Sequence, residues 1–157
     1  MTAFFSYFVE FLVHVEPSIG DGKDRTDGMF FFSAHTSDID VAVVHPSAPS
    51  HLRRGVKPLG TAALKEKEKF DTYFLKAQQD GRRFYAFVLE TFGAIGTNAR
   101  EFISALADEA VANGISSLYG YKFTDFILRS ISVTLQLGNS YLMTTASKQA
   151  RLKRRRT

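Results

Sequence analysis

The chain is organised around three segments: RTDGMFFF (residues 25–32), SDIDVAVVHP (residues 37–46) and TAALKEKEKFDTYF (residues 61–74). The first two contain short apolar runs that are rich in aromatic or β-branched residues and bounded by turn-forming residues, which is typical of strands. The third begins at Thr61, a good helix-capping residue, and repeats apolar side chains at helical spacing. We therefore predict two neighbouring strands, followed by a helix that ends near Gln79.

The strand predicted over 39–44 carries an acid among apolar neighbours. Its alternation separates two faces, which consist of Ile39, Val41 and Val43 on one side and Asp38, Asp40, Ala42 and Val44 on the other. Apart from the acids both faces are apolar, as expected of a central strand that is covered on both sides. Because an unpaired carboxylate in such a strand is costly, Asp40 gives the clearest functional signal in the sequence.

The remaining elements complete a small α/β domain. We expect a strand over 29–32, a buried helix rather than a strand over 4–15, a third strand over 84–89, and helices over 98–113 and 124–137. Asn98 and Glu101 resemble a capping pair for the first of these later helices. The sum is an α/β fold with a small mixed central sheet flanked by helices.

Positive charge is concentrated at the C-terminal end of the 157-residue chain. Residues 148–156 contain six basic side chains and no acid, and removing them from the formal net charge of +4 leaves the rest at −2. We expect a single domain over 1–147 and a basic, disordered tail over 148–157 that contacts phosphates or serves as a nuclear address; a solvated end without a ligand is the alternative. The expected location is the nucleus, and otherwise the cytoplasm.

The apolar N-terminal segment does not predict a membrane protein. Glu10 and His14 interrupt it, and it is shorter than the roughly 20 apolar residues that a transmembrane helix needs. The chain also has no cysteine, which excludes a disulfide framework and thiolate metal ligands.

Asp27, Asp40 and Lys69 together fit a metal-dependent phosphodiesterase. Hydrolysis of a phosphodiester needs an activated water and neutralisation of the charge that develops on phosphorus, and Mg²⁺ held by one or two carboxylates supplies both. Two neighbouring strands can bring the acids together, and the helix can return Lys69 to the same place. Spacing alone leaves a plainer interpretation open, in which the acids form turns and the lysine is solvated.

The order of these segments, followed by FYAFVLETFG (residues 84–93) and ILRSISVTLQLGNSYLM (residues 127–143), resembles a known nuclease family. This family is the restriction-endonuclease-like domain of reverse transcriptase proteins from site-specific non-LTR retrotransposons. It belongs to the PD-(D/E)XK nucleases, in a form whose lysine lies on the helix after the strand. The resemblance covers roughly residues 24–143 and implies a restriction-endonuclease-like fold.

The resemblance assigns roles to four candidate catalytic residues. Asp27 matches the acid of the PD motif and Asp40 the second acid, so these two would hold Mg²⁺ or Mn²⁺. Lys69 matches the migrated lysine. Glu90 matches a recurrent acid at the end of the next strand, with a role in metal binding, in phosphate contacts or in structure.

Nucleic-acid contacts are expected from other positions. Tyr73 matches the aromatic residue that follows the family's lysine. Arg53, Arg54 and Lys57 form a candidate phosphate-contact patch in the loop before the helix, with solvated loop charges as the alternative. This sequence departs from the family motif at Thr26, where the motif has proline.

These features predict a Mg²⁺- or Mn²⁺-dependent DNA endonuclease domain that nicks target DNA to prime reverse transcription. Its expected partner is DNA, with RNA or a reverse transcriptase domain as further candidates. The alternative is a catalytically inactive remnant of the same fold that binds nucleic acid or serves a structural role.

Overall fold

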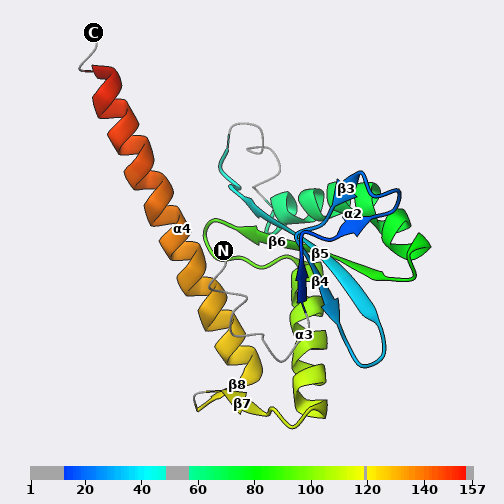
Figure 1. Ribbon diagram of the computed structural model, residues 1–157. Helices are drawn as coiled ribbons and strands as arrows, with labels where there is room; N and C mark the ends of the chain where they lie inside the picture. The colour runs from blue at the N-terminus through cyan, green and yellow to red at the C-terminus, as the bar shows by residue number, and fades with distance from the viewer. Residues whose placement is uncertain (1–12, 49–56, 119, 155–157) are drawn as a thin grey trace.

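The computed structural model describes residues 13–48, 57–118 and 120–154 (Figure 1). Most of the helix predicted over 4–15 lies outside these residues. Its last three residues, Val13–Val15, form strand β1, so the helix prediction is wrong there. The reason is pairing: β1 lies antiparallel to the next sheet strand, with Val13 opposite Phe30.

A four-stranded mixed sheet forms the centre of the fold. Its order is β1-β4-β5-β6, with β4 at Gly28–Phe31, β5 at Thr36–Val44 and β6 at Arg83–Glu90. Strand β4 is antiparallel to both of its neighbours, β1 and β5, whereas β5 and β6 are parallel. The parallel pair is joined by a helical crossover, as parallel neighbours require. The predicted α/β class with a small mixed sheet is therefore confirmed.

Two short hairpins accompany the sheet. The first, β2 (Ser18–Ile19) with β3 (Asp24–Arg25), lies between β1 and β4 in the chain. The second, β7 (Ser117–Leu118) with β8 (Tyr121–Lys122), leads into the last helix. The first hairpin matters for the site because it leads directly to Asp27.

Helices cover both faces of the sheet (Figure 1). Helix α2 (Gly60–Gln79) packs on one face, over a core that includes Ala62, Ala77, Phe84, Ala86 and Val88. Helices α3 (Thr97–Ala112) and α4 (Phe123–Arg154) pack on the other face, over a core that includes Ile39, Phe87, Phe102, Ile103 and Ile131. The two predicted faces of β5 thus meet different helices, and Asp40 faces α2.

The helix starts differ from the predicted caps. The N-cap of α2 is Leu59, in a left-handed conformation with φ 59°, rather than Thr61, which is buried. The side chain of Asn98 does not cap α3; its Oδ1 accepts a hydrogen bond from Ala86 N–H (2.6 Å) at the edge of β6. Glu66 of α2 instead accepts from Asn98 N–H (2.9 Å), so a carboxylate from a neighbouring helix stabilises the start of α3.

Helix α4 is longer than predicted. It passes through Gly138 and Asn139, where the sequence predicts its end, and continues to Arg154. Residues 148–154, predicted to belong to a disordered tail, are therefore helical, which suits their Ala, Lys, Gln and Arg content. The second half of α4 extends away from the sheet (Figure 1). Within the described ranges no helix has the length and apolarity needed to cross a membrane.

Gly96, at the start of α3, is expected to tolerate no larger residue. A Cβ added there would lie 2.2 Å from Glu66 Oε1 and 3.0 Å from the carbonyl oxygen of Val88. We expect Gly96→Ala to lower the free energy of unfolding by about 1–3 kcal/mol in urea titrations, because the Glu66 carboxylate is displaced from the helix start. Gly138→Ala is the matched control: nothing lies within 4 Å of its Cβ, so it should be neutral or stabilising.

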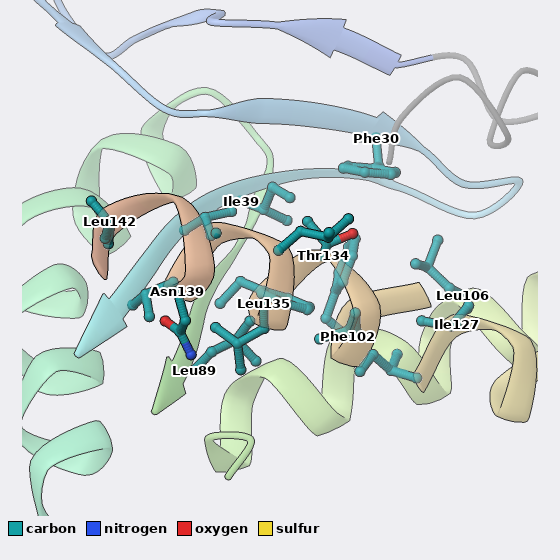
Figure 2. A pocket seen from close by; sticks show the side chains of 17 residues that line it. Phe30, Ile39, Leu89, Phe102, Leu106, Ile127, Thr134, Leu135, Asn139 and Leu142 are labelled. Atoms are coloured by element: carbon teal, nitrogen blue, oxygen red, sulfur yellow. The ribbon is translucent and has the colours of Figure 1, made fainter. Parts of the chain in front are cut away.

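An apolar pocket of about 470 Å³ lies between the sheet and α4 (Figure 2). Its walls come from the sheet, α3 and α4, and include Phe30, Ile39, Leu106, Leu135 and Leu142. Its polar side chains are Thr134 and Asn139, and Asn139 Nδ2 donates to the carbonyl oxygen of Thr91 (2.9 Å). The pocket belongs to the sheet face opposite Asp40 and is lined by no titratable side chain from the described part of the chain.

Candidate active site

Asp27 lies in the link between β3 and β4, against the middle of β5. Its main-chain N–H donates to the carbonyl oxygen of Ile39 (3.0 Å), and its Oδ2 accepts a hydrogen bond from Val41 N–H (2.6 Å). Main-chain pairing of β4 with β5 ends at Gly28 and Ile39. Beyond that point the Asp27 side chain takes the place of a strand residue as the hydrogen-bond acceptor of β5. These two bonds hold the Asp27 carboxylate beside the strand that carries Asp40.

Asp40 extends from β5 toward α2 and is 6% exposed. Burial raises the pKa of its carboxyl group, the ion pair with Lys69 lowers this pKa, and the charge and side chain of Asp27 raise it again. Asp27 Oδ2 is bonded to the amide of Val41, the residue after Asp40, so the two carboxyl groups lie near each other along β5. Asp40 is buried and Asp27 is half-buried, and two acids near each other in such a place favour a cation or a proton beside them.

Lys69 and Tyr73 reach the same place from α2. The Lys69 ammonium forms an ion pair with Asp40 Oδ2, and the two side chains are 16% and 9% exposed. Tyr73 follows one turn later, on the same side of the helix. Burial raises the pKa of its hydroxyl, and the negative charges of Asp40, Asp24 and Asp27 raise it further. The helix therefore pairs a cation with Asp40 and carries a tyrosine one turn further along the same side.

Glu90 lies away from this group. Asp40 is opposite Ala86 and Val44 is opposite Glu90, so four residues along the parallel pair, about 13 Å, separate the two acids. Glu90 Oε1 accepts a hydrogen bond from Ala62 N–H (3.3 Å) at the start of α2, which has no side-chain cap of its own. The structure therefore separates Glu90 from the other predicted catalytic residues and gives it the position of a helix-capping acid.

The predicted phosphate-contact patch is described in part. Arg53 and Arg54 lie outside the described residues. Lys57 is exposed just before α2. A contact between this loop and DNA stays a prediction.

Four buried or partly buried charges near the acid pair, in two ion pairs, were not predicted as site residues. Asp38 is 0% exposed and pairs with Arg82, whose Nη1 lies 3.2 Å from its Oδ1. Asp24 of β3 forms an ion pair with Lys76 of α2. The alternation of side chains along the strand correctly placed Asp38 on the same face as Asp40. It could not identify Arg82 as the partner of Asp38, because Arg82 lies 44 residues later, beyond a helix and a turn.

The donor set fits a hydrated divalent cation. Asp27 and Asp40 offer carboxylate oxygens, and in the described ranges no cluster of three or more His, Cys, Asp or Glu side chains can hold a metal. Mg²⁺ usually keeps several waters and is held by one or two carboxylates together with substrate phosphates. The pair therefore fits Mg²⁺ or Mn²⁺ that shares a substrate phosphate, and it does not fit a metal enclosed by protein ligands.

Comparisons with protein-family models and with curated proteins found no match to this chain. The resemblance to retrotransposon nucleases therefore stays a prediction.

Proposed function

We propose that this chain is a Mg²⁺- or Mn²⁺-dependent DNA endonuclease domain of the restriction-endonuclease-like kind. The proposal depends above all on one observation: Asp27 Oδ2 is bonded to the amide next to Asp40, and the Asp40 carboxylate pairs with the Lys69 ammonium. Two acids and a lysine in one partly buried place are the groups that metal-assisted phosphodiester hydrolysis uses.

Each residue has a separate task in this reaction. Asp27 and Asp40 would hold the cation, whose contribution when bound is to activate water and to neutralise charge on the phosphate. Lys69 turns its ammonium from Asp40 toward the scissile phosphate and stabilises the charge that develops there. The Tyr73 hydroxyl contacts the DNA backbone beside the acids.

The basic end of α4 supplies affinity that does not depend on base sequence. Residues 148–156 carry six of the basic side chains, and the described part of this segment is helical and extends away from the sheet. Contacts between these charges and DNA phosphates release counterions, so binding weakens as salt rises.

The test is nicking of supercoiled plasmid by the purified full chain with Mg²⁺, Mn²⁺ or EDTA. We expect open-circular product with either metal, none with EDTA, and none with Asp27→Asn. Asp71→Asn is the matched control, because Asp71 is an exposed acid of α2 that pairs with Lys67, and it should nick at the wild-type rate. Equal nicking by wild type and Asp27→Asn would exclude the proposed site.

A catalytically inactive nucleic-acid-binding module is the second candidate. One observation favours it: the Lys69 ammonium already neutralises Asp40. This candidate predicts that the chain shifts DNA in a native gel equally well with Mg²⁺ and with EDTA, and that Asp27→Asn binds like wild type without any nicking by either protein.

The pH dependence of metal binding follows from the raised pKa of Asp40. The carboxylate binds metal and the protonated acid does not, so affinity is lost as pH falls through this raised pKa, at a higher pH than for an ordinary aspartate. Lys69 lowers the pKa of Asp40, so Lys69→Met should move the midpoint of this loss to still higher pH. Mn²⁺ titrations at a series of pH values measure both midpoints; an unchanged midpoint in Lys69→Met would contradict the assignment.

A further inference from the structure

Asp38 and Arg82 form a buried ion pair next to the acid pair. Asp38 lies two residues before Asp40 on the same face of β5 and is fully buried. Burial raises the pKa of Asp38, and the positive charge of Arg82 opposes this rise. A buried ion pair is weak support for stability by itself, which leaves open what else this one does.

Arg82 connects three separate parts of the chain. Its Nη1 donates to Asp38 Oδ1 of β5 (3.2 Å). Its Nη2 donates to the carbonyl oxygen of Ser18 in β2 (3.2 Å) and also bonds Asp80 after α2. Arginine suits this role because its guanidinium is planar and offers five donors in fixed directions. Arg82 therefore joins the β2–β3 hairpin to the central strand.

The β2–β3 hairpin depends on such links. Each of its strands has two residues, and an isolated hairpin of this size is not stable. The hairpin buries one apolar side chain, that of Ile19. Polar contacts also link it to α2 and to the turn after α2: Asp24 pairs with Lys76, and Gly20 N–H donates to Asp80 Oδ2 (3.0 Å). The hairpin would shift relative to β5 if these links were removed.

The end of this hairpin sets the position of Asp27. Thr26, which follows β3, is 2% exposed; its N–H donates to the carbonyl oxygen of Pro17 (3.2 Å) and its hydroxyl donates to Asp38 Oδ1 (3.4 Å). The next residue, Asp27, accepts from Val41 N–H. One oxygen of Asp38 thus contacts both Arg82 and the residue before Asp27.

We propose that Arg82 and Asp38 are positioning residues that hold the Asp27 carboxylate against β5, beside Asp40. They act through the β2–β3 hairpin and Thr26 and contact neither the cation nor the DNA. That this pair positions the Asp27 carboxylate does not depend on the proposed function, whereas its effect on metal binding and nicking rests on that function. Loss of a residue that orients a metal ligand without touching the metal typically weakens metal affinity about 10- to 100-fold.

The direct readout is the Val41 amide, which donates to Asp27 Oδ2 and can be followed by NMR without any activity. In Arg82→Met we expect the Val41 amide proton to move upfield and to exchange at least about 10-fold faster with solvent. Arg83→Met is the matched control, because Arg83 is the next residue, is exposed, and loses the same charge. Its Val41 amide should stay as in wild type.

A second variant covers the case in which Arg82→Met does not fold because Asp38 is left buried and unpaired. The double variant Asp38→Leu and Arg82→Met replaces the pair with apolar side chains, which a core tolerates. It should fold, lose the Val41 hydrogen bond, and bind Mn²⁺ about 10- to 100-fold more weakly than wild type. A folded double variant whose Val41 amide matches wild type would overturn the positioning role. If the wild-type chain binds no Mn²⁺, the proposed function fails while the Val41 amide still decides this inference.

Discussion

Asp40→Ala is expected to abolish DNA nicking and to destabilise the fold at the same time. Loss of a metal-binding carboxylate removes several kcal/mol of transition-state stabilisation, so kcat/KM for plasmid nicking should fall at least about 10³-fold. The free energy of unfolding should fall by about 3 kcal/mol, because Lys69, 16% exposed, keeps its charge without Asp40. Nicking assays and urea titrations measure the two effects.

A double variant separates the two effects. Asp40→Leu combined with Lys69→Met replaces the ion pair with apolar side chains of similar size, which should restore most of the stability. Nicking should remain absent, because the metal-binding carboxylate and the ammonium are both gone. Nicking by a stable double variant would show that the reaction takes place elsewhere in the chain.

Phe102→Ala is expected to have the largest effect on stability. Phe102 is 2% exposed, and its ring lies 4.9–6.2 Å from four other aromatic rings, those of Phe30, Phe32, Tyr85 and Phe87. Removing the ring leaves a cavity where α3 meets the sheet, at a cost of about 3–5 kcal/mol in the free energy of unfolding. Denaturant titration measures this loss.

Phe92→Ala is the control for the loss of a phenylalanine ring. Phe92 is 70% exposed, in the turn after β6, so its removal should change the free energy of unfolding by less than about 0.5 kcal/mol. If the two variants lost equal stability, Phe102 would not be a central residue of the core.

The elements of this fold were largely predictable because each has a strong local signal. Alternation along β5 correctly assigned Ile39 and Asp40 to opposite faces, since side-chain direction in a strand depends on parity alone. The helix end after Gln79 and the position of β6 also followed from local residues. The end of α4 was predicted wrongly, because Gly138 and Asn139 are weak helix breakers when good helix formers follow.

The site was predictable in part, for a different reason. Lys69 was selected through a family resemblance, since a lysine in a charged helix has no local signal that distinguishes it from a solvated one. Arg82 and the capping position of Glu90 were not predictable, because both depend on how β6 is placed against α2 and β5. Pairings of this kind are set by tertiary packing, which periodicity does not report.

The connectivity of the sheet has a consequence for the order in which the site is assembled during folding. Asp27 meets β5 through a hairpin, across 14 residues to Val41, whereas Lys69 reaches Asp40 across 29 residues and needs the crossover helix in place. Because closing a longer loop loses more chain entropy, the hairpin contacts are expected to form first. Two like charges then come together before their counter-ion arrives, so β4–β5 pairing gains its full stability when α2 docks.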